Sequence, residues 1–345
     1  AKNEEVFAKC NRILKFGRNL LIFSEGFTDD VFVRRLKPIK KGAVRIGFGA
    51  LEYMNWEKRI YIQALGVNYS DPNVLGSDVV ISNGEPICLN DYQKEYEENP
   101  SKVISDLTKR VEIEMQEQLT DVRNIEWTDF HEQVMRLTKK GMCAVDVNKS
   151  IPLLKRWEYS RHLAKWMNNL DLDGNDELVN LKKKMHNYFQ LLDKEKIKEN
   201  ELTMLTKNEF NPFNEVLFFI VTFPVMLLGM LHNYLPYAWV KSFVEKSFKR
   251  TVFWGSVKLL LGALVIGLYN ILLISVINIF IFPAFSFWLI YFFVIPPISG
   301  LVAYAYFKKW GRYKRLRTLK KNDYTEINAE KESCLSEISR LIPVA

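Results

Sequence analysis

The alternation of hydrophobic and polar residues predicts a helix and then a strand at the start of the chain. Hydrophobic side chains recur at helical spacing over residues 3–16, and Gly17 follows where a left-handed C-cap is expected. Leu20–Phe23 is a short hydrophobic run that predicts a buried strand. The polar turn at residues 24–26 follows it, in the position where α/β proteins place loops that contact ligands.

A similar pattern continues to residue 90. A second helix is expected from Lys40 to about Met54, and hydrophobic runs at Ile60–Val67 and Val79–Ser82 predict two further strands. This order of elements predicts an α/β layer domain, with helices packed on a largely parallel sheet. Three strands with no strand before the first helix make a poor core, so residues 1–90 are expected to be the C-terminal part of an incomplete domain.

Residues 91–211 form a strongly charged region. Residues 91–210 hold 43 charged side chains in 120 positions, with hydrophobic residues at three- to four-residue spacing. This pattern predicts solvated helices that link or cover the first domain. Asp171–Asp176 superficially resembles a calcium-binding loop, but its glycine is fourth rather than sixth, so the segment is interpreted as a helix-breaking turn. No metal site is expected.

Residues 212–310 are hydrophobic and are expected to form a membrane region. Spanning helices are predicted at about 253–282 and 284–307, because each contains 24 consecutive uncharged residues. About 20 such residues are enough to cross the hydrocarbon core of a bilayer. A tight turn at Pro283 is expected to join the two helices.

The segment at residues 216–240 is equally uncharged, but unlike the two predicted spans it contains prolines and polar residues near its middle. Pro224 and Pro236 interrupt it, and His232 and Asn233 place polar groups near its middle. These features favour a re-entrant or interfacial segment over a simple span. Such a segment would keep all soluble parts of the chain on one side of the membrane.

The positive charge of the chain is concentrated after the hydrophobic region. The formal net charge is +8, and eight basic residues with no acidic residue among them follow Phe307: Lys308, Lys309, Arg312, Lys314, Arg315, Arg317, Lys320 and Lys321. Basic clusters beside a membrane segment bind anionic headgroups and mark the cytoplasmic side. We therefore expect an integral membrane protein with a cytoplasmic soluble domain and a basic cytoplasmic tail at 311–345, and no nucleic-acid partner.

The cysteines suggest a reducing compartment. Cys10, Cys88, Cys143 and Cys334 are widely scattered and lack zinc-ligand spacing, which favours reduced thiols. The chain opens at Ala1 without a signal-peptide pattern and without Met, and is expected to be cut from something longer.

Four short blocks in the first 90 residues occur in a distinctive order. Phe23–Gly26 reads F-S-E-G, Lys40–Ala43 reads K-K-G-A, and Asn68–Pro72 and Gly84–Ile87 follow. Motifs of P-loop, dinucleotide-binding, serine hydrolase and zinc protease enzymes are absent. The ordered blocks resemble the phospholipid/glycerol acyltransferase family, whose third block reads approximately F-P-E-G-T-R-S and is followed by L-x-P-F-K-K-G-A.

The resemblance implies roles for individual residues. Glu25 and Gly26 match the acceptor-binding block, where the glutamate orders the loop and the glycine lets the backbone approach the ligand. Lys40 and Lys41, followed by Gly42, match the basic pair near the acceptor's phosphate. Their place at a helix start would add a favourable field for an anion.

The third block also departs from the family pattern. Ser24 stands where the family has Pro, Phe27 where it has Thr, and Thr28 where it has the Arg that faces the phosphate. Arg34 and Arg35 are candidates to supply the missing guanidinium. In the alternative reading, Glu25 only accepts backbone donors and the lysines are solvated.

The largest departure is the absence of the family's catalytic dyad, H-x-x-x-x-D, in which histidine is the general base. His131, His162, His186 and His232 are each followed five positions later by a residue other than Asp. They are expected to be surface or membrane-interface histidines, and no catalytic residue is assigned. The resemblance places the dyad upstream, so the chain alone is expected to be inactive.

The resemblance implies the function of the intact protein. It would transfer a fatty acyl group from acyl-CoA or an acyl carrier protein to glycerol 3-phosphate or 1-acylglycerol 3-phosphate. No metal or redox cofactor is expected, and the partners are the acyl donor, the phosphorylated acceptor and membrane lipids. Residues 212–307 are similar to the membrane tail of long members of the family. Two alternatives remain: a non-enzymatic membrane scaffold or lipid-binding relative, and an acyltransferase for another lipid.

Overall fold

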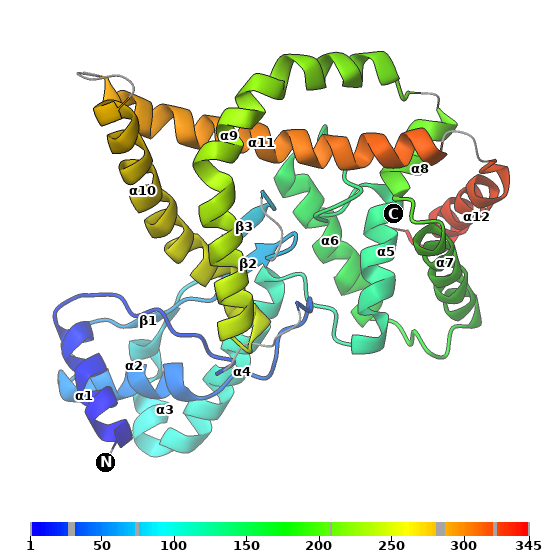
Figure 1. Cartoon of the computed structure of the whole chain (residues 1–345). Coiled ribbons are helices and arrows are strands. Elements are labelled where there is room, and N and C mark those ends of the chain that lie inside the picture. The colour runs from blue at the N-terminus through cyan, green and yellow to red at the C-terminus, as the bar shows by residue number, and fades with distance from the viewer. Residues whose placement is uncertain are drawn as a thin grey trace. The chain divides into compact units, whose positions relative to one another are not determined.

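Helices dominate the fold. The computed structural model describes residues 2–26, 32–72, 76–207, 209–280, 287–319 and 323–343. Its composition is 70% helix and 4% strand, and the strands form two separate two-stranded sheets (Figure 1). The prediction of an incomplete acyltransferase α/β layer domain is therefore wrong.

The two helices expected near the N-terminus are confirmed. They are α1 (Lys2–Lys15) and α2 (Gly42–Tyr53), and they pack on one another. The buried face of α2 carries Phe48, whose ring stacks on Tyr96 with centroids 4.1 Å apart. This hydrophobic core continues into the helices that follow the strands.

The strands differ from the prediction in length and direction. The run expected at 60–67 divides into two strands that belong to different sheets. The strands are β1 (Tyr61–Ile62), β2 (Leu65–Tyr69), β3 (Val79–Asn83) and β4 (Ile87–Cys88). Both pairs, β1–β4 and β2–β3, are antiparallel. A parallel pair needs a crossover of a dozen or more residues, and the short connection between β2 and β3 permits only a hairpin.

No strand forms at 20–23. Leu21 and Phe23 are 70% and 82% exposed, and the segment has no ladder partner. A hydrophobic run alone does not specify a strand, because a strand is stable only when its backbone groups pair with a neighbour. The expectation of a buried strand at Leu20–Phe23 is wrong for this reason.

The charged region is helical, as predicted. Its helices are α3 (Gln93–Glu98), α4 (Pro100–Gln118), α5 (Thr128–Thr138), α6 (Leu153–Asn168), α7 (Asp176–Lys194) and α8 (Glu199–Thr206). Asn99 caps α4 by accepting from the Lys102 backbone N–H, and Pro100 opens the helix. The turn at Asp171–Asp176 separates α6 from α7, and Gly174 N donates to Asp171 Oδ1 within it.

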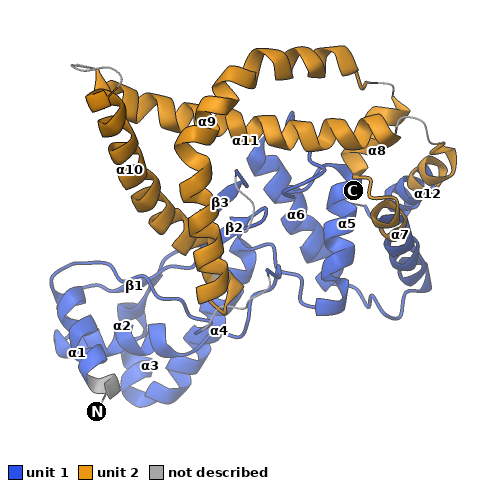
Figure 2. Cartoon of the chain, viewed as in Figure 1, with its two compact units in different colours: residues 1–189, 332–345 blue, residues 190–331 orange. Residues whose placement is uncertain are grey.

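The chain divides into two compact units (Figure 2). The first unit contains residues 1–189 and 332–345, and the second contains residues 190–331. The end of the last helix, α12 (Thr325–Leu341), pairs with α7 in the first unit through Glu337 and Lys184, 2.6 Å apart. The domain limits expected at residues 90, 211 and 310 stay predictions.

The second unit contains three long hydrophobic helices. They are α9 (Pro212–Ser247), α10 (Trp254–Phe280) and α11 (Trp288–Leu319). Each is long and apolar enough to cross a membrane, which makes the chain a membrane-associated protein. The expected turn at Pro283 lies outside the described residues.

The helix α9 is continuous and curved, and it contains both Pro224 and Pro236 (Figure 1). It does not turn back on itself at residues 216–240. Whether it spans the membrane or lies at the interface stays a prediction. Gly229 allows α9 to approach α11 closely, because a Cβ at this position would lie 2.1 Å from the Ser299 carbonyl oxygen.

Candidate functional site

The residues that match the acceptor-binding and basic blocks lie in two segments that bond to one another. Lys40 N donates to the Ser24 carbonyl oxygen at 2.9 Å. Lys37 N donates to Glu25 Oε1 at 3.0 Å. Residues 24–26 and 37–42 therefore form one local structure, which we call the loop cluster.

Gly26 lies beside the Lys40 side chain within the loop cluster. Its φ is +86°, a conformation that side chains with a Cβ rarely adopt. A Cβ at this position would also lie 2.5 Å from Lys40 Nζ. The Lys40 side chain thus passes close to Gly26, which brings the two sequence blocks together.

Lys40 and Lys41 stand at the start of α2, as predicted from the sequence. Lys41 is the N-cap residue, Gly42 is the first helical residue, and the first turn contains no acidic side chain. Both lysine side chains are exposed. The unpaired backbone N–H groups at a helix start and two ammonium groups beside them create a region that favours an anion.

The Glu25 carboxylate helps to order the loop cluster. Its bond to the Lys37 backbone fixes the distance between the turn and the segment that leads into α2. A carboxylate that accepts a backbone N–H orders a loop, and this contact agrees with both readings of Glu25 that the sequence allows. Thr28, which stands at the position of the missing arginine, lies outside the described residues.

Arg34 is a structural clamp. Its guanidinium donates to the backbone oxygens of Tyr69, Ser70 and Met142 at 2.8–3.0 Å, and Nε donates to Glu132 Oε2 at 3.1 Å. A guanidinium has five N–H groups, and four of them form these bonds, so Arg34 is committed to a structural role. The Arg35 side chain is exposed, so of the two candidate arginines it has more freedom to reach an anion.

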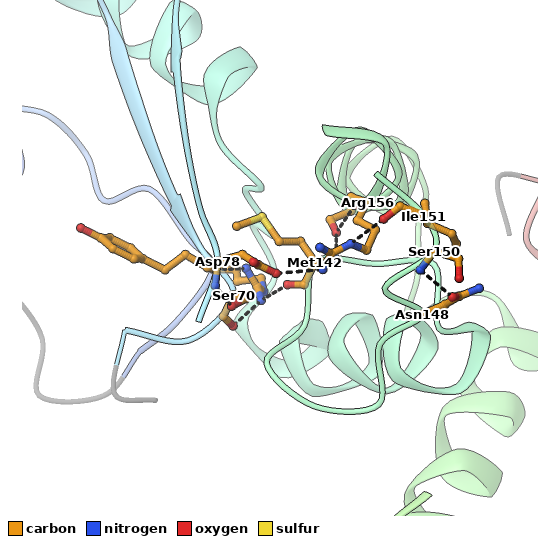
Figure 3. Close-up of polar contacts among 10 residues, drawn as sticks. Ser70, Asp78, Met142, Asn148, Ser150, Ile151 and Arg156 are labelled. Carbon is orange, nitrogen blue, oxygen red and sulfur yellow. Dashed lines mark hydrogen bonds and ion pairs between the residues drawn. The ribbon is translucent and has the colours of Figure 1, made fainter. Parts of the chain in front are cut away.

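A second arginine clamp lies next to the first. Arg156 Nη1 donates to Asp78 Oδ2 at 2.9 Å, and Asp78 N donates to Ser70 Oγ at 2.8 Å. Figure 3 shows Ser70 and Asp78 from the β2–β3 hairpin beside Met142 and Arg156 from the helical region. Together the clamps fasten the hairpin to α5, α6 and the loop between them. No sequence pattern indicated these clamps, because the partners are distant in sequence and several are backbone oxygens.

The interior of the first unit also contains a buried histidine. His131 is completely buried in α5, and burial lowers its pKa to about 3. Its Nε2 lies 2.9 Å from the Ser160 carbonyl oxygen, so this nitrogen carries the proton and donates it. The expectation of a surface position is therefore wrong for His131, although His162 and His186 are exposed.

Asp121 is a further polar group that the sequence did not reveal as buried. Its Oδ1 accepts from the Leu36 backbone N–H at 2.7 Å, and the residue is 5% exposed. Burial is the main cause that raises the pKa of this carboxyl. Asp121 thereby fixes the segment between Arg34 and the loop cluster.

The three hydrophobic helices meet at a polar group of side chains, which we call the His232 network. His232 Nδ1 lies 2.5 Å from Asn270 Oδ1 in α10, and Nε2 lies 2.9 Å from Tyr291 Oη in α11. Asn270 Nδ2 donates to the His232 and Ile266 carbonyl oxygens, so its Oδ1 is the acceptor and His232 Nδ1 is the donor.

His232 is fully buried, so the expectation of a membrane-interface or surface position is also wrong for this residue. Polar groups inside hydrophobic helices are stable only when they bond to one another. The His232 network satisfies this condition and joins all three helices. Its hydrogen bonds occupy both ring nitrogens, which indicates a role in helix packing.

Within the described ranges, no group of three or more His, Cys, Asp or Glu side chains is arranged to hold a metal ion. Comparison with protein-family models, curated proteins and solved structures returns no match for this chain. The functional assignment therefore depends on the sequence blocks and on the geometry of the loop cluster.

Proposed function

We propose that the chain is the acceptor-binding and membrane-anchoring part of a glycerophospholipid acyltransferase. The intact protein transfers a fatty acyl group from acyl-CoA or an acyl carrier protein to glycerol 3-phosphate or 1-acylglycerol 3-phosphate. One observation carries the proposal. The E-G block and the K-K-G block, which are separate in sequence, adjoin where Lys40 crosses Gly26.

The loop cluster has the chemistry that this acceptor needs. Lys40 and Lys41 bind the phosphate, and the backbone N–H groups at the start of α2 add their field. Glu25 holds the loop in place through Lys37 N. Fixing the phosphate orients the acceptor hydroxyl for attack on the thioester carbonyl, which releases the donor thiol.

The general base for this step is not assigned to any residue of the chain, since no histidine here belongs to an H-x-x-x-x-D pattern. In the proposal, the base belongs to another part of the intact protein. The thioester supplies the driving force, so the reaction itself requires only the acyl donor as co-substrate.

The ends of α9 support a cytoplasmic location for the soluble parts. Near its start, Glu215 pairs with Arg312 of α11 at 2.9 Å, and near its end, Glu245 pairs with Lys258 of α10 at 2.7 Å. Basic residues concentrate at these ends of α10 and α11, which are the ends expected to face the cytoplasm. In this arrangement, both ends of the curved α9 lie near the cytoplasmic side, while α10 and α11 cross.

The direct test is an acyl-transfer assay on the intact, membrane-embedded protein. Acyl-CoA and 1-acylglycerol 3-phosphate are supplied, and the released thiol and the diacylated product are measured. Equal amounts of both products support the proposal. If neither forms, with acyl carrier protein as donor and glycerol 3-phosphate as acceptor also tried, the scaffold alternative is favoured.

A further inference from the structure

A groove with a volume of about 360 Å³ lies on the C-terminal half of α9, in the second unit. Its lining recurs at helical spacing and includes Tyr234, Tyr237, Lys241, Ser242, Glu245 and Lys246. Hydroxyl and ammonium groups thus lie on one face of a helix that is otherwise hydrophobic. A polar face at the end of a hydrophobic helix is where lipid headgroups are found.

The groove has an excess of positive charge. Glu245 is its acidic residue, and the Glu245 carboxylate is paired with Lys258 of α10 at 2.7 Å. Lys241 and Lys246 are exposed, and neither forms an ion pair with any other residue that the structure describes. Lys241 lies in the field of the Glu245 carboxylate but forms no close ion pair with it. Two exposed ammonium groups without a close ion pair, next to three hydroxyl groups, are suited to a phosphate.

The aromatic side chains near the groove are of the kind found at a membrane surface. Tyr234 and Tyr237 are each 55% exposed. Trp239 and Phe243 are also exposed and stack with ring centroids 5.4 Å apart. Exposed tyrosine and tryptophan at the end of a hydrophobic helix are typical of the headgroup level of a bilayer, where phosphates lie.

The face of α9 that carries the groove continues into exposed hydrophobic residues. Phe223, Leu227 and Leu231 precede Tyr234 at spacings of three and four residues, and each is about half exposed. At 1.5 Å per residue, Lys241 lies about 15 Å from Leu231 along the helix, which is about half of a ~30 Å hydrocarbon core. This face is long enough to hold an acyl chain in one leaflet.

We propose that the groove binds an anionic glycerophospholipid of the surrounding membrane. Lys241 and Lys246 contact its phosphate, the Tyr234, Tyr237 and Ser242 hydroxyls donate to its headgroup oxygens, and one acyl chain lies along the hydrophobic face. The site is independent of acyl transfer, so it does not depend on the proposed function.

Native mass spectrometry of the full chain, released from detergent with added lipid, tests the proposal. The probes are phosphatidylglycerol and phosphatidylcholine with identical acyl chains, and inorganic phosphate. The unaltered chain should bind phosphatidylglycerol more tightly than phosphatidylcholine. The Lys241→Gln/Lys246→Gln variant should lose about 30-fold in phosphatidylglycerol affinity, since each lysine near an anionic membrane contributes about fivefold. Lys241→Arg/Lys246→Arg should retain most of it.

A matched control distinguishes specific lipid binding in the groove from general attraction of anionic lipid to basic side chains. Lys102→Gln/Lys109→Gln removes the same charge from exposed positions of α4, outside the groove and the basic cluster, and should leave the affinity nearly unchanged. The proposal is overturned if this control loses as much phosphatidylglycerol affinity as the Lys241→Gln/Lys246→Gln variant. It is also overturned if that variant binds phosphatidylglycerol as tightly as the unaltered chain. Displacement of the lipid by millimolar inorganic phosphate would indicate a free-anion site and also overturn it.

If the glutamine variant does not fold, the unaltered chain provides the second measurement. A phosphatidylglycerol with a photoactivatable headgroup should label residues 234–246 in proteoliposomes. Labelling only outside this segment would contradict the site.

Discussion

The buried His131 makes the stability of the first unit depend on pH. In the folded chain, burial lowers the pKa of His131 to about 3, whereas an exposed histidine side chain has a pKa of about 6.5. The unfolded chain therefore binds the additional proton at a higher pH than the folded chain does. The free energy of unfolding is unaffected above about pH 6.5, falls as the pH falls from 6.5 towards 3, and then levels off.

The magnitude follows from the two pKa values. Each pH unit between them lowers the free energy of unfolding by about 1.4 kcal/mol. Lowering the pH from 7 to 5 should therefore destabilise the first unit by about 2 kcal/mol. The contribution of Asp121 to the pH dependence of unfolding has the opposite sign. Its raised pKa makes the folded chain hold a proton more tightly than the unfolded chain as the pH falls. A comparison with a His131 variant isolates the histidine.

Hydrogen–deuterium exchange of the α5 amides in the detergent-solubilised full chain measures this effect, after correction for intrinsic exchange rates. The control is His131→Gln, whose side-chain amide keeps a donor for the Ser160 carbonyl oxygen but does not titrate. The pH 7 to pH 5 decrease should be about 2 kcal/mol smaller in this variant. An equal decrease in both proteins would refute the reasoning.

Three further predictions concern the clamps and the helices. Arg34→Met should lower the free energy of unfolding of the first unit by about 3 kcal/mol, because it leaves buried carbonyl oxygens without donors. Urea unfolding measures this loss, with Arg34→Lys as the control. Asn270→Leu should weaken packing of the hydrophobic helices by about 1 kcal/mol, because His232 loses its acceptor. Detergent-induced unfolding, followed by circular dichroism of the helices, measures this loss. An unchanged unfolding free energy would contradict a role of the His232 network in packing. For topology, an impermeant thiol reagent outside intact cells should label Ser286→Cys and not Ser101→Cys in a chain without its native cysteines, and the reverse pattern would contradict a cytoplasmic soluble domain.

Local sequence patterns predicted the helices well. The 3.6-residue period over residues 3–16 and the K-K-G start of the second helix are confirmed in α1 and α2. Hydrophobic composition identified the apolar helices α10 and α11, since such segments need no knowledge of tertiary partners.

Local sequence patterns could not predict the direction of the strands or which polar side chains are buried. The run at 60–67 divides between two sheets, and Leu20–Phe23 has no partner, because strand pairing is decided by distant residues. The burial of His131 and the backbone bonds of Arg34 likewise depend on segments that meet only after folding. The proximity of Gly26 and Lys40 is the part of the candidate site that only the structure revealed.

The most direct test of the acceptor-binding proposal is the acceptor's KM in the intact enzyme. Lys40→Ala/Lys41→Ala should raise the KM for the phosphorylated acceptor at least as clearly as it lowers kcat, because the two ammonium groups bind the phosphate. Lys102→Ala/Lys109→Ala removes the same charge from exposed positions of α4 and serves as the control. A tenfold or larger rise in KM for the first variant alone is the predicted result. Unchanged acceptor kinetics in that variant would contradict the proposed role of the loop cluster.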